Sequence, residues 1–264
     1  MKRVPYQRSI AAMNTRFDVF LRGGDEEHLE AVAVAVLEEI IRLDGALSRF
    51  DPRSEISRVN REAGKTAVRV DRELFALLET CEQGRQATNG FFDVTQGGGL
   101  ELDASVYAVR LASAESRIDL GGVGKGYALD CGREILRRFN VESGLLQGGT
   151  SSVLAVGDEA WPIDLRHPLK PDVIVGRIEL ANRGLSCSAA RHADKQESDV
   201  VNPLTGEPLV GDDACVVLAA SATEAEIFST ALLAMGREMA TQYLANSTVV
   251  AGWIDADFAW IKSL

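Results

Sequence analysis

The stretch Ile118-Asp119-Leu120-Gly121-Gly122-Val123-Gly124-Lys125-Gly126-Tyr127 places four glycines and a lysine within six residues. Glycines directly before a helix let the backbone approach a ligand closely, and free N–H groups at the helix start favour an anion. The spacing is not that of a Walker A loop, which needs glycine at position 119 and serine or threonine at position 126, and it is not GxGxxG. The stretch therefore predicts a strand-to-helix turn, either one that binds an anionic ligand or a tight turn without one.

Outward from this turn, apolar residues recur at helical spacing. They predict helices at 29–50, 54–60, 72–88, after residue 126, and from a capping box at 221–224 to about residue 235. Alternating and β-branched segments predict strands at 15–21, 116–120, 145–147, 152–156, 173–180, 214–219, 249–254 and 258–261. Because strands and helices interleave without a strict βαβ rhythm, we expect one α+β unit over residues 1–264.

The charge of the chain restricts its partners. Its 264 residues carry 28 basic and 39 acidic side chains, for a net charge of −11. No Lys/Arg run is long enough to build the basic face of a nucleic-acid-binding protein, so we expect no nucleic-acid partner. A phosphate-bearing ligand would need local devices, namely backbone N–H groups, a single lysine or a metal ion.

The cysteines and the N-terminus bear on the compartment. Cys81, Cys131, Cys187 and Cys215 form no CxxC pair, so neither a zinc site nor disulfides are expected. No apolar run approaches the roughly 18 residues of a membrane span, and the first 17 residues lack the apolar region of a signal peptide. A cytoplasmic protein is the simplest expectation, although a chain trimmed of its leader would look the same.

One predicted helix carries oxygen donors on a single face. Glu226, Ser229 and Thr230 stand at positions i, i+3 and i+4, which lie side by side on a helix. A carboxylate with hydroxyls suits Mg²⁺ or Ca²⁺. An ordinary polar stripe is the alternative.

Seven segments, in order along residues 13–236, resemble those of the FAD:protein FMN transferase family (the ApbE family). Residues 119–128, DLGGVGKGYA, are close to the family's D-L-G-G-[IV]-[AG]-K-G-Y-A, the most specific of the seven. The other six are 13–17, 48–60, 90–95, 147–149, 202–206 and 225–232. The resemblance implies an α+β fold of the T-fold-like ApbE type, with mixed or antiparallel sheets and packed helices. It also implies Mg²⁺-dependent transfer of FMN from FAD to a Thr or Ser of an acceptor protein, with release of AMP. The family often works outside the cytoplasmic membrane.

The resemblance also implies roles for particular residues. It implies FAD contacts from Met13, Ser48, Arg49, Phe50, Phe91, Phe92, Asp93, Asp119, Lys125 and Val201. It implies metal ligation by the backbone carbonyl of Gly122 and by Glu226, Ser229 and Thr230. Each of these residues also has a purely structural interpretation. The aromatic residues and Met13 could pack in the hydrophobic core, and Asp93 and Asp119 could stabilise a turn or cap a helix.

The sequence departs from the family at several of these positions. Asp199 stands where the family has a histidine implicated in catalysis, and Glu226 stands for the usual aspartate. A carboxylate at 199 can accept a proton, but it repels a pyrophosphate unless a metal intervenes. His192 is either a substitute for that histidine or a solvated surface residue, and Cys187 is read as structural rather than nucleophilic. Three functions stay open: an active flavin transferase, a binder of FAD with impaired or slow hydrolytic activity, and a non-catalytic scaffold.

Overall fold

The computed structural model describes residues 4–193, 198–255 and 257–262. Its centre is an eight-stranded sheet in the order β1-β2-β6-β7-β10-β11-β12-β13, in which every neighbouring pair is antiparallel. These strands are β1 (Tyr6–Ala12), β2 (Thr15–Arg22), β6 (Ser143–Gly148), β7 (Ser152–Val156), β10 (Gly184–Ala189), β11 (Ala214–Ala219), β12 (Val250–Ile254) and β13 (Phe258–Lys262).

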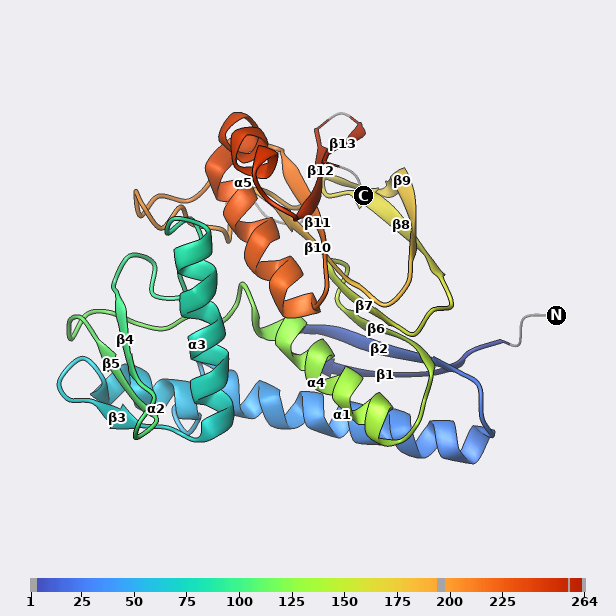
Figure 1. The fold of residues 1–264 in the computed structure, drawn as a ribbon, viewed down its shortest axis with the longest axis horizontal. Coiled ribbons are helices and arrows are strands. Elements are labelled where there is room, and N and C mark those ends of the chain that lie inside the picture. The colour runs from blue at the N-terminus through green and yellow to red at the C-terminus, as the bar shows by residue number, and fades with distance from the viewer. Residues whose placement is uncertain (1–3, 194–197, 256, 263–264) are drawn as a thin grey trace.

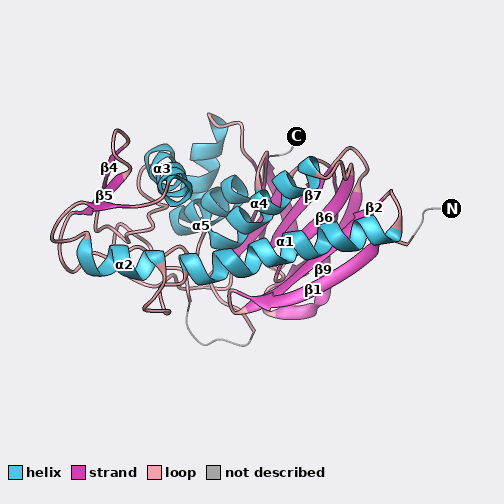
Figure 2. Ribbon diagram, turned by 90° about the horizontal axis from the view of Figure 1, so that it is seen from below, coloured by secondary structure: helices cyan, strands magenta, loops and turns pink. Residues whose placement is uncertain are grey.

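Helices cover one face of this sheet and a hairpin covers the other. The helices are α1 (Glu26–Leu47), α4 (Gly124–Arg138) and α5 (Ala222–Ala245), which lie side by side (Figures 1 and 2). The hairpin consists of β8 (Trp161–His167) and β9 (Lys170–Leu180). Its apolar residues pack with the sheet residues that point away from the helices.

A second group of elements extends beyond the sheet, at the left of Figure 1. It contains α2 (Glu55–Glu62), α3 (Arg72–Ala87) and a three-stranded sheet of β3 (Val68–Arg69), β5 (Ala108–Leu111) and β4 (Leu100–Asp103). Helix α3 contacts α5, so this group joins the rest of the fold through a shared apolar core.

Strand β11 shows why the centre of the sheet is apolar on both faces. Cys215 and Val217 pack toward α5, whereas Val216 and Leu218 pack toward the hairpin. A strand covered on both faces is expected to lose polar alternation, and every residue of β11 is buried.

The α+β class and the antiparallel sheets are confirmed, but the strand expected at 116–120 is wrong. Ile118 and Leu120 are buried as that pattern requires. The backbone, however, bonds to Asn60, whose amide oxygen accepts from the Ile118 N–H at 2.7 Å and whose amide nitrogen donates to the Ile118 carbonyl at 2.9 Å. The Asp119 N–H donates to the carbonyl of Val94, which leaves no strand ladder. Over the part of the chain that the structure describes, no helix combines the length and apolarity that a membrane crossing needs.

Candidate active site

The glycine-rich turn is held by Asp119. One carboxylate oxygen accepts from the N–H of Gly121 at 2.9 Å, and the other lies 3.2 Å from Nε of Arg49. Helix α4 begins directly afterwards, at Gly124, and its N-cap residue supplies no side-chain hydrogen bond. The turn therefore leads into the start of a helix, as the sequence predicted. Most of its N–H groups are bonded within the protein, however: those of Val123 and Gly124 donate to the carbonyl of Leu120, and that of Gly126 donates to a side chain of α5.

The turn opens onto a cavity of about 530 Å³, which we call the turn cavity. The expected site residues that line it are Arg49, Phe50, Phe91, Phe92, Asp93, Asp119, Gly122, Lys125, Asp199, Val201, Glu226 and Thr230. Met13 and Ser48 line an adjoining cavity of about 260 Å³, which shares Arg49, Phe50, Asp119 and Lys125 with it. Ser229 lies outside both linings and is fully buried.

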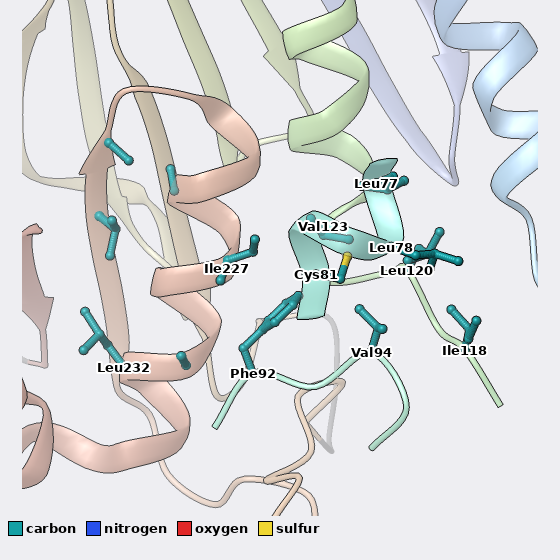
Figure 3. Packing of buried hydrophobic residues seen from close by; sticks show 14 of the residues in the cluster. Leu77, Leu78, Cys81, Phe92, Val94, Ile118, Leu120, Val123, Ile227 and Leu232 are labelled. Carbon is teal, nitrogen blue, oxygen red and sulfur yellow. The ribbon is translucent and has the colours of Figure 1, made fainter. Parts of the chain in front are cut away.

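The aromatic residues differ in exposure. Phe92 is buried in the core between α3, α5 and the glycine-rich turn (Figure 3). Phe50 is 70% exposed, and the guanidinium of Arg49 lies 4.4 Å from its ring centroid. Phe92 thus anchors the cavity wall, whereas Phe50 offers an open ring face at its mouth.

Asp93 organises its own loop. One carboxylate oxygen accepts from the N–H and the hydroxyl of Thr95, both at 2.7 Å. The other accepts from the N–H of Gly97 at 3.0 Å. This carboxylate has a structural task even though the residue also lines the turn cavity.

Glu226 is the most constrained charge in the cavity. Glu226 is only 3% exposed to solvent. Oε2 accepts from the N–H of Gly126 at 2.7 Å, and Oε1 accepts from the Ser152 hydroxyl and lies 3.1 Å from Nζ of Lys125. A buried carboxylate needs such partners to remain charged, so α4, α5 and β7 meet at this one group.

Hydroxyls continue from the adjacent turn of α5 to strand β10. The Ser188 hydroxyl lies 2.8 Å from that of Ser229 and 3.3 Å from that of Thr230. Ser229 in turn donates to Ser186 at 2.9 Å. Thr230, Ser186 and Ser188 all line the turn cavity, and Ser229 joins the helix to the sheet behind them.

The donors fit a hard divalent cation. The Glu226 carboxylate, the Thr230 hydroxyl and the Gly122 backbone line the same cavity, and oxygen ligands of these kinds suit Mg²⁺. A methyl group built on Gly122 would lie 3.9 Å from the Thr230 hydroxyl, which shows how near the two residues are. In this structure the cation beside Glu226 is the ammonium of Lys125.

The remaining candidates also line the turn cavity. Asp199 is exposed, and Val201 forms an isolated bridge with Pro208. His192 and Cys187 also line the cavity. Desolvation raises the pKa of the Cys187 thiol to about 12, so it is not a thiolate at neutral pH, and its reading as structural agrees with this.

Sequence reasoning missed several residues of the site. Ser152, Ser186 and Ser188 carry the hydrogen bonds around Glu226 and α5, but they stand on strands far away in the sequence. Alternation along β10, with Ser186 and Ser188 on one face and Leu185 and Cys187 on the other, is the signal that would have grouped them.

Comparison with known proteins gives a consistent picture. The model of the ApbE family matches residues 13–103 and 98–253. Two proteins called FAD:protein FMN transferase are each 24% identical: one from Klebsiella pneumoniae (strain 342), over 80% of this chain and 78% of its own, and one from Treponema pallidum (strain Nichols), over 77% and 72%. The structure of the ApbE protein of Thermotoga maritima has a TM-score of 0.86 at 22% identity, covering 95% of this chain and 94% of its own. That of the flavin transferase ApbE from Vibrio cholerae has a TM-score of 0.82 at 17% identity, covering 97% and 96%. At these identities, the solved structures establish the shared fold.

Proposed function

Because this chain belongs to the ApbE family, we propose that it is an FAD:protein FMN transferase that uses Mg²⁺. Its substrates would be FAD and an acceptor protein that presents a threonine or serine. Its products would be the flavinylated acceptor and AMP.

The observation that carries the proposal is the composition of the turn cavity. The motif residues matched to FAD contacts, including Asp119 and Lys125, share one space with the oxygen donors of Glu226 and Thr230. Four carboxylates line this cavity, those of Asp93, Asp119, Asp199 and Glu226. A diphosphate entering such a site requires compensating positive charge, which a divalent cation supplies.

The chemistry exchanges the phosphoanhydride bond of FAD for a phosphoester bond to the acceptor. The acceptor hydroxyl oxygen would form a bond to the phosphorus of the FMN half of FAD, and the bond from that phosphorus to the AMP oxygen would break. Asp199 would take the hydroxyl proton, and AMP would leave as the phosphate monoester. The ammonium of Lys125 and the backbone N–H of Gly122 would hold the diphosphate oxygens.

The residues that would hold Mg²⁺ are Gly122, Glu226 and Thr230, with Ser229 supporting Thr230 through Ser188. When bound, Mg²⁺ neutralises pyrophosphate charge and polarises the phosphoryl oxygens. For Glu226 to contribute Oε1, Lys125 must give up its contact, and an arriving diphosphate offers the ammonium another anion.

The first test is a fluorescence titration of the purified protein with FAD, in Mg²⁺ and again in EDTA. Micromolar or tighter binding that weakens in EDTA supports the flavin–metal site. No binding in either buffer leaves only the fold in common with the family and removes the proposal. AMP release that requires an acceptor then separates transfer from hydrolysis.

A second function rests on one specific observation, the carboxylate of Asp199 where the family has a histidine. An FAD-binding protein with impaired transfer would bind FAD but release no AMP when acceptor is added. The variant Asp199→His separates the two. A gain of transfer over wild type favours the impaired protein, and a loss favours a working Asp199.

A further inference from the structure

A separate cavity of about 480 Å³ lies between the β8–β9 hairpin and the sheet, and we call it the hairpin cavity. Its walls are mainly apolar, with Val153, Leu165 and Leu185 among them, and Gln147 adds an amide. Small-molecule and peptide sites have this volume and this mixture of apolar walls with a few polar groups. None of the residues matched to FAD or metal contacts lines it.

His167 gives this cavity a fixed hydrogen-bond donor. The residue is 7% exposed and lines the cavity. Its Nδ1 accepts from the N–H of Leu169 at 3.1 Å, so in the neutral ring the proton is on Nε2. Among the described residues, Nε2 has no hydrogen-bond partner. A ligand oxygen that accepts from Nε2 would add a hydrogen bond in this cavity.

The hairpin cavity adjoins the turn cavity. Ser151, Cys187 and His192 line both. A group in the hairpin cavity thus lies next to residues that also line the proposed site of phosphoryl transfer. This position suits a substrate that must place one atom at the phosphorus while the rest of it stays outside the FAD site.

We propose that the hairpin cavity binds the acceptor polypeptide beside its modified threonine or serine, an inference that rests on the proposed function. An apolar acceptor side chain packs against Val153, Leu165 and Leu185. A main-chain carbonyl of the acceptor accepts from Nε2 of His167. The hydroxyl then enters the turn cavity past His192, toward Asp199.

The variants separate the two nitrogens of His167. In His167→Asn the side-chain oxygen takes the place of Nδ1 and keeps the Leu169 bond, but nothing replaces Nε2. In His167→Gln the amide nitrogen takes the place of Nε2 and restores the donor. Pro162→Trp blocks the rim of the cavity, because Pro162 is exposed on β8 and lines it. Val173→Trp adds the same bulk to the exposed part of β9, outside the cavity, as the matched control.

The probe is a library of nine-residue peptides with a central threonine and varied flanks, incubated with the full chain, FAD and Mg²⁺ and read by attached flavin. Wild type is expected to favour an apolar residue at one fixed flanking position. For a selected peptide, His167→Asn raises KM about fivefold, the effect of one lost hydrogen bond, and His167→Gln largely restores it. Pro162→Trp raises KM tenfold or more, Val173→Trp leaves it unchanged, and FAD affinity stays within twofold in all four.

Three other results would each contradict acceptor binding in the hairpin cavity, and they can be told apart. Weaker FAD binding in Pro162→Trp and His167→Asn would place the flavin itself in the hairpin cavity. Unchanged peptide KM in these variants, with normal transfer, would remove the cavity from acceptor binding and leave the proposed function intact. If wild type binds FAD but labels no peptide and no added protein, both the transferase function and this inference fail together.

Discussion

The ion pair between Lys125 and Glu226 predicts a strong energetic coupling in the ligand-free protein. The charged atoms lie 3.1 Å apart, and the side chains are only 24% and 4% exposed. At an effective dielectric constant of about 20, the Coulomb attraction is about 5 kcal/mol. Desolvation of both groups offsets most of this. We expect a net coupling of about 0.5–3 kcal/mol, the range for contacting residues in one network.

The assay is a double-mutant cycle by urea denaturation, with Lys125→Met, Glu226→Gln and the double variant. Both replacements keep side-chain length and remove charge. Glu226→Gln alone should be the most destabilising, because it leaves the Lys125 ammonium facing an amide and disturbs the Ser152 bond. The exposed Arg8–Glu30 pair, at 2.8 Å, provides the control cycle and should show the smaller coupling. Equal couplings in the two cycles would refute the argument that burial makes the Lys125–Glu226 pair strong.

Three further outcomes are expected. Gly126→Ala should cost about 1–3 kcal/mol in urea denaturation, because its Cβ would lie 2.5 Å from the Ala222 carbonyl oxygen; Gly124→Ala, with nothing within 4 Å, should not destabilise the chain. The pKa of Cys187 is raised to about 12 from 9.0, so its thiolate fraction at pH 8 is roughly 1,000-fold lower and rises with pH up to that value. Disulfide-reagent labelling of Cys187, compared with a peptide thiol, checks this, and equal rates would contradict it. Glu226→Ala should weaken Mg²⁺-dependent FAD binding about tenfold or more; unchanged affinity by fluorescence titration would remove this residue from the site, and Glu238→Ala, exposed on the same helix, serves as control.

Local patterns predicted the central elements because their burial follows a simple period. Helices α1 and α3 and strands β7 and β11 agree with their predicted ranges to within a few residues. Strand β1 was missed because it lies at the edge of the sheet, where most of its residues are exposed and no apolar alternation develops. Strand β10 was missed because its small residues, Gly-Leu-Ser-Cys-Ser-Ala, carry little β-propensity.

The end of α5 shows a different limit. The predicted helix stops near Met235, and the backbone leaves helical geometry at Gly236, where φ is 74°. Helical structure then resumes and continues to Ala245. A glycine after an apolar run is a helix-stop signal, and here packing of Ala240 and Leu244 in the core restarts the helix. The stop signal correctly predicted the break at Gly236, but tertiary packing determines the helical structure that follows it.

The site follows the same division. The family motifs predicted that Asp119, Lys125 and Glu226 share one site, and in the structure all three line one cavity. The motifs could not predict which charged side chains form ion pairs or hydrogen bonds with one another. A glutamate is one methylene longer than the aspartate it replaces. The structure shows where the Glu226 carboxylate reaches: to the N–H of Gly126, the hydroxyl of Ser152 and the ammonium of Lys125. These partners stand about 100 and 74 residues away in sequence.

That arrangement changes how the acidic cavity should be understood. The carboxylate of Asp119 is paired with Arg49, that of Glu226 with Lys125, and that of Asp93 accepts three bonds from its own loop. The protein thus compensates these charges internally before any ligand arrives. In the proposed function, a diphosphate that drew Lys125 toward itself would uncover an oxygen of Glu226, and a divalent cation that took this oxygen would free Lys125 for the diphosphate. Each ligand would therefore prepare the site for the other, and by linkage we expect each to raise the affinity of the other by the same factor.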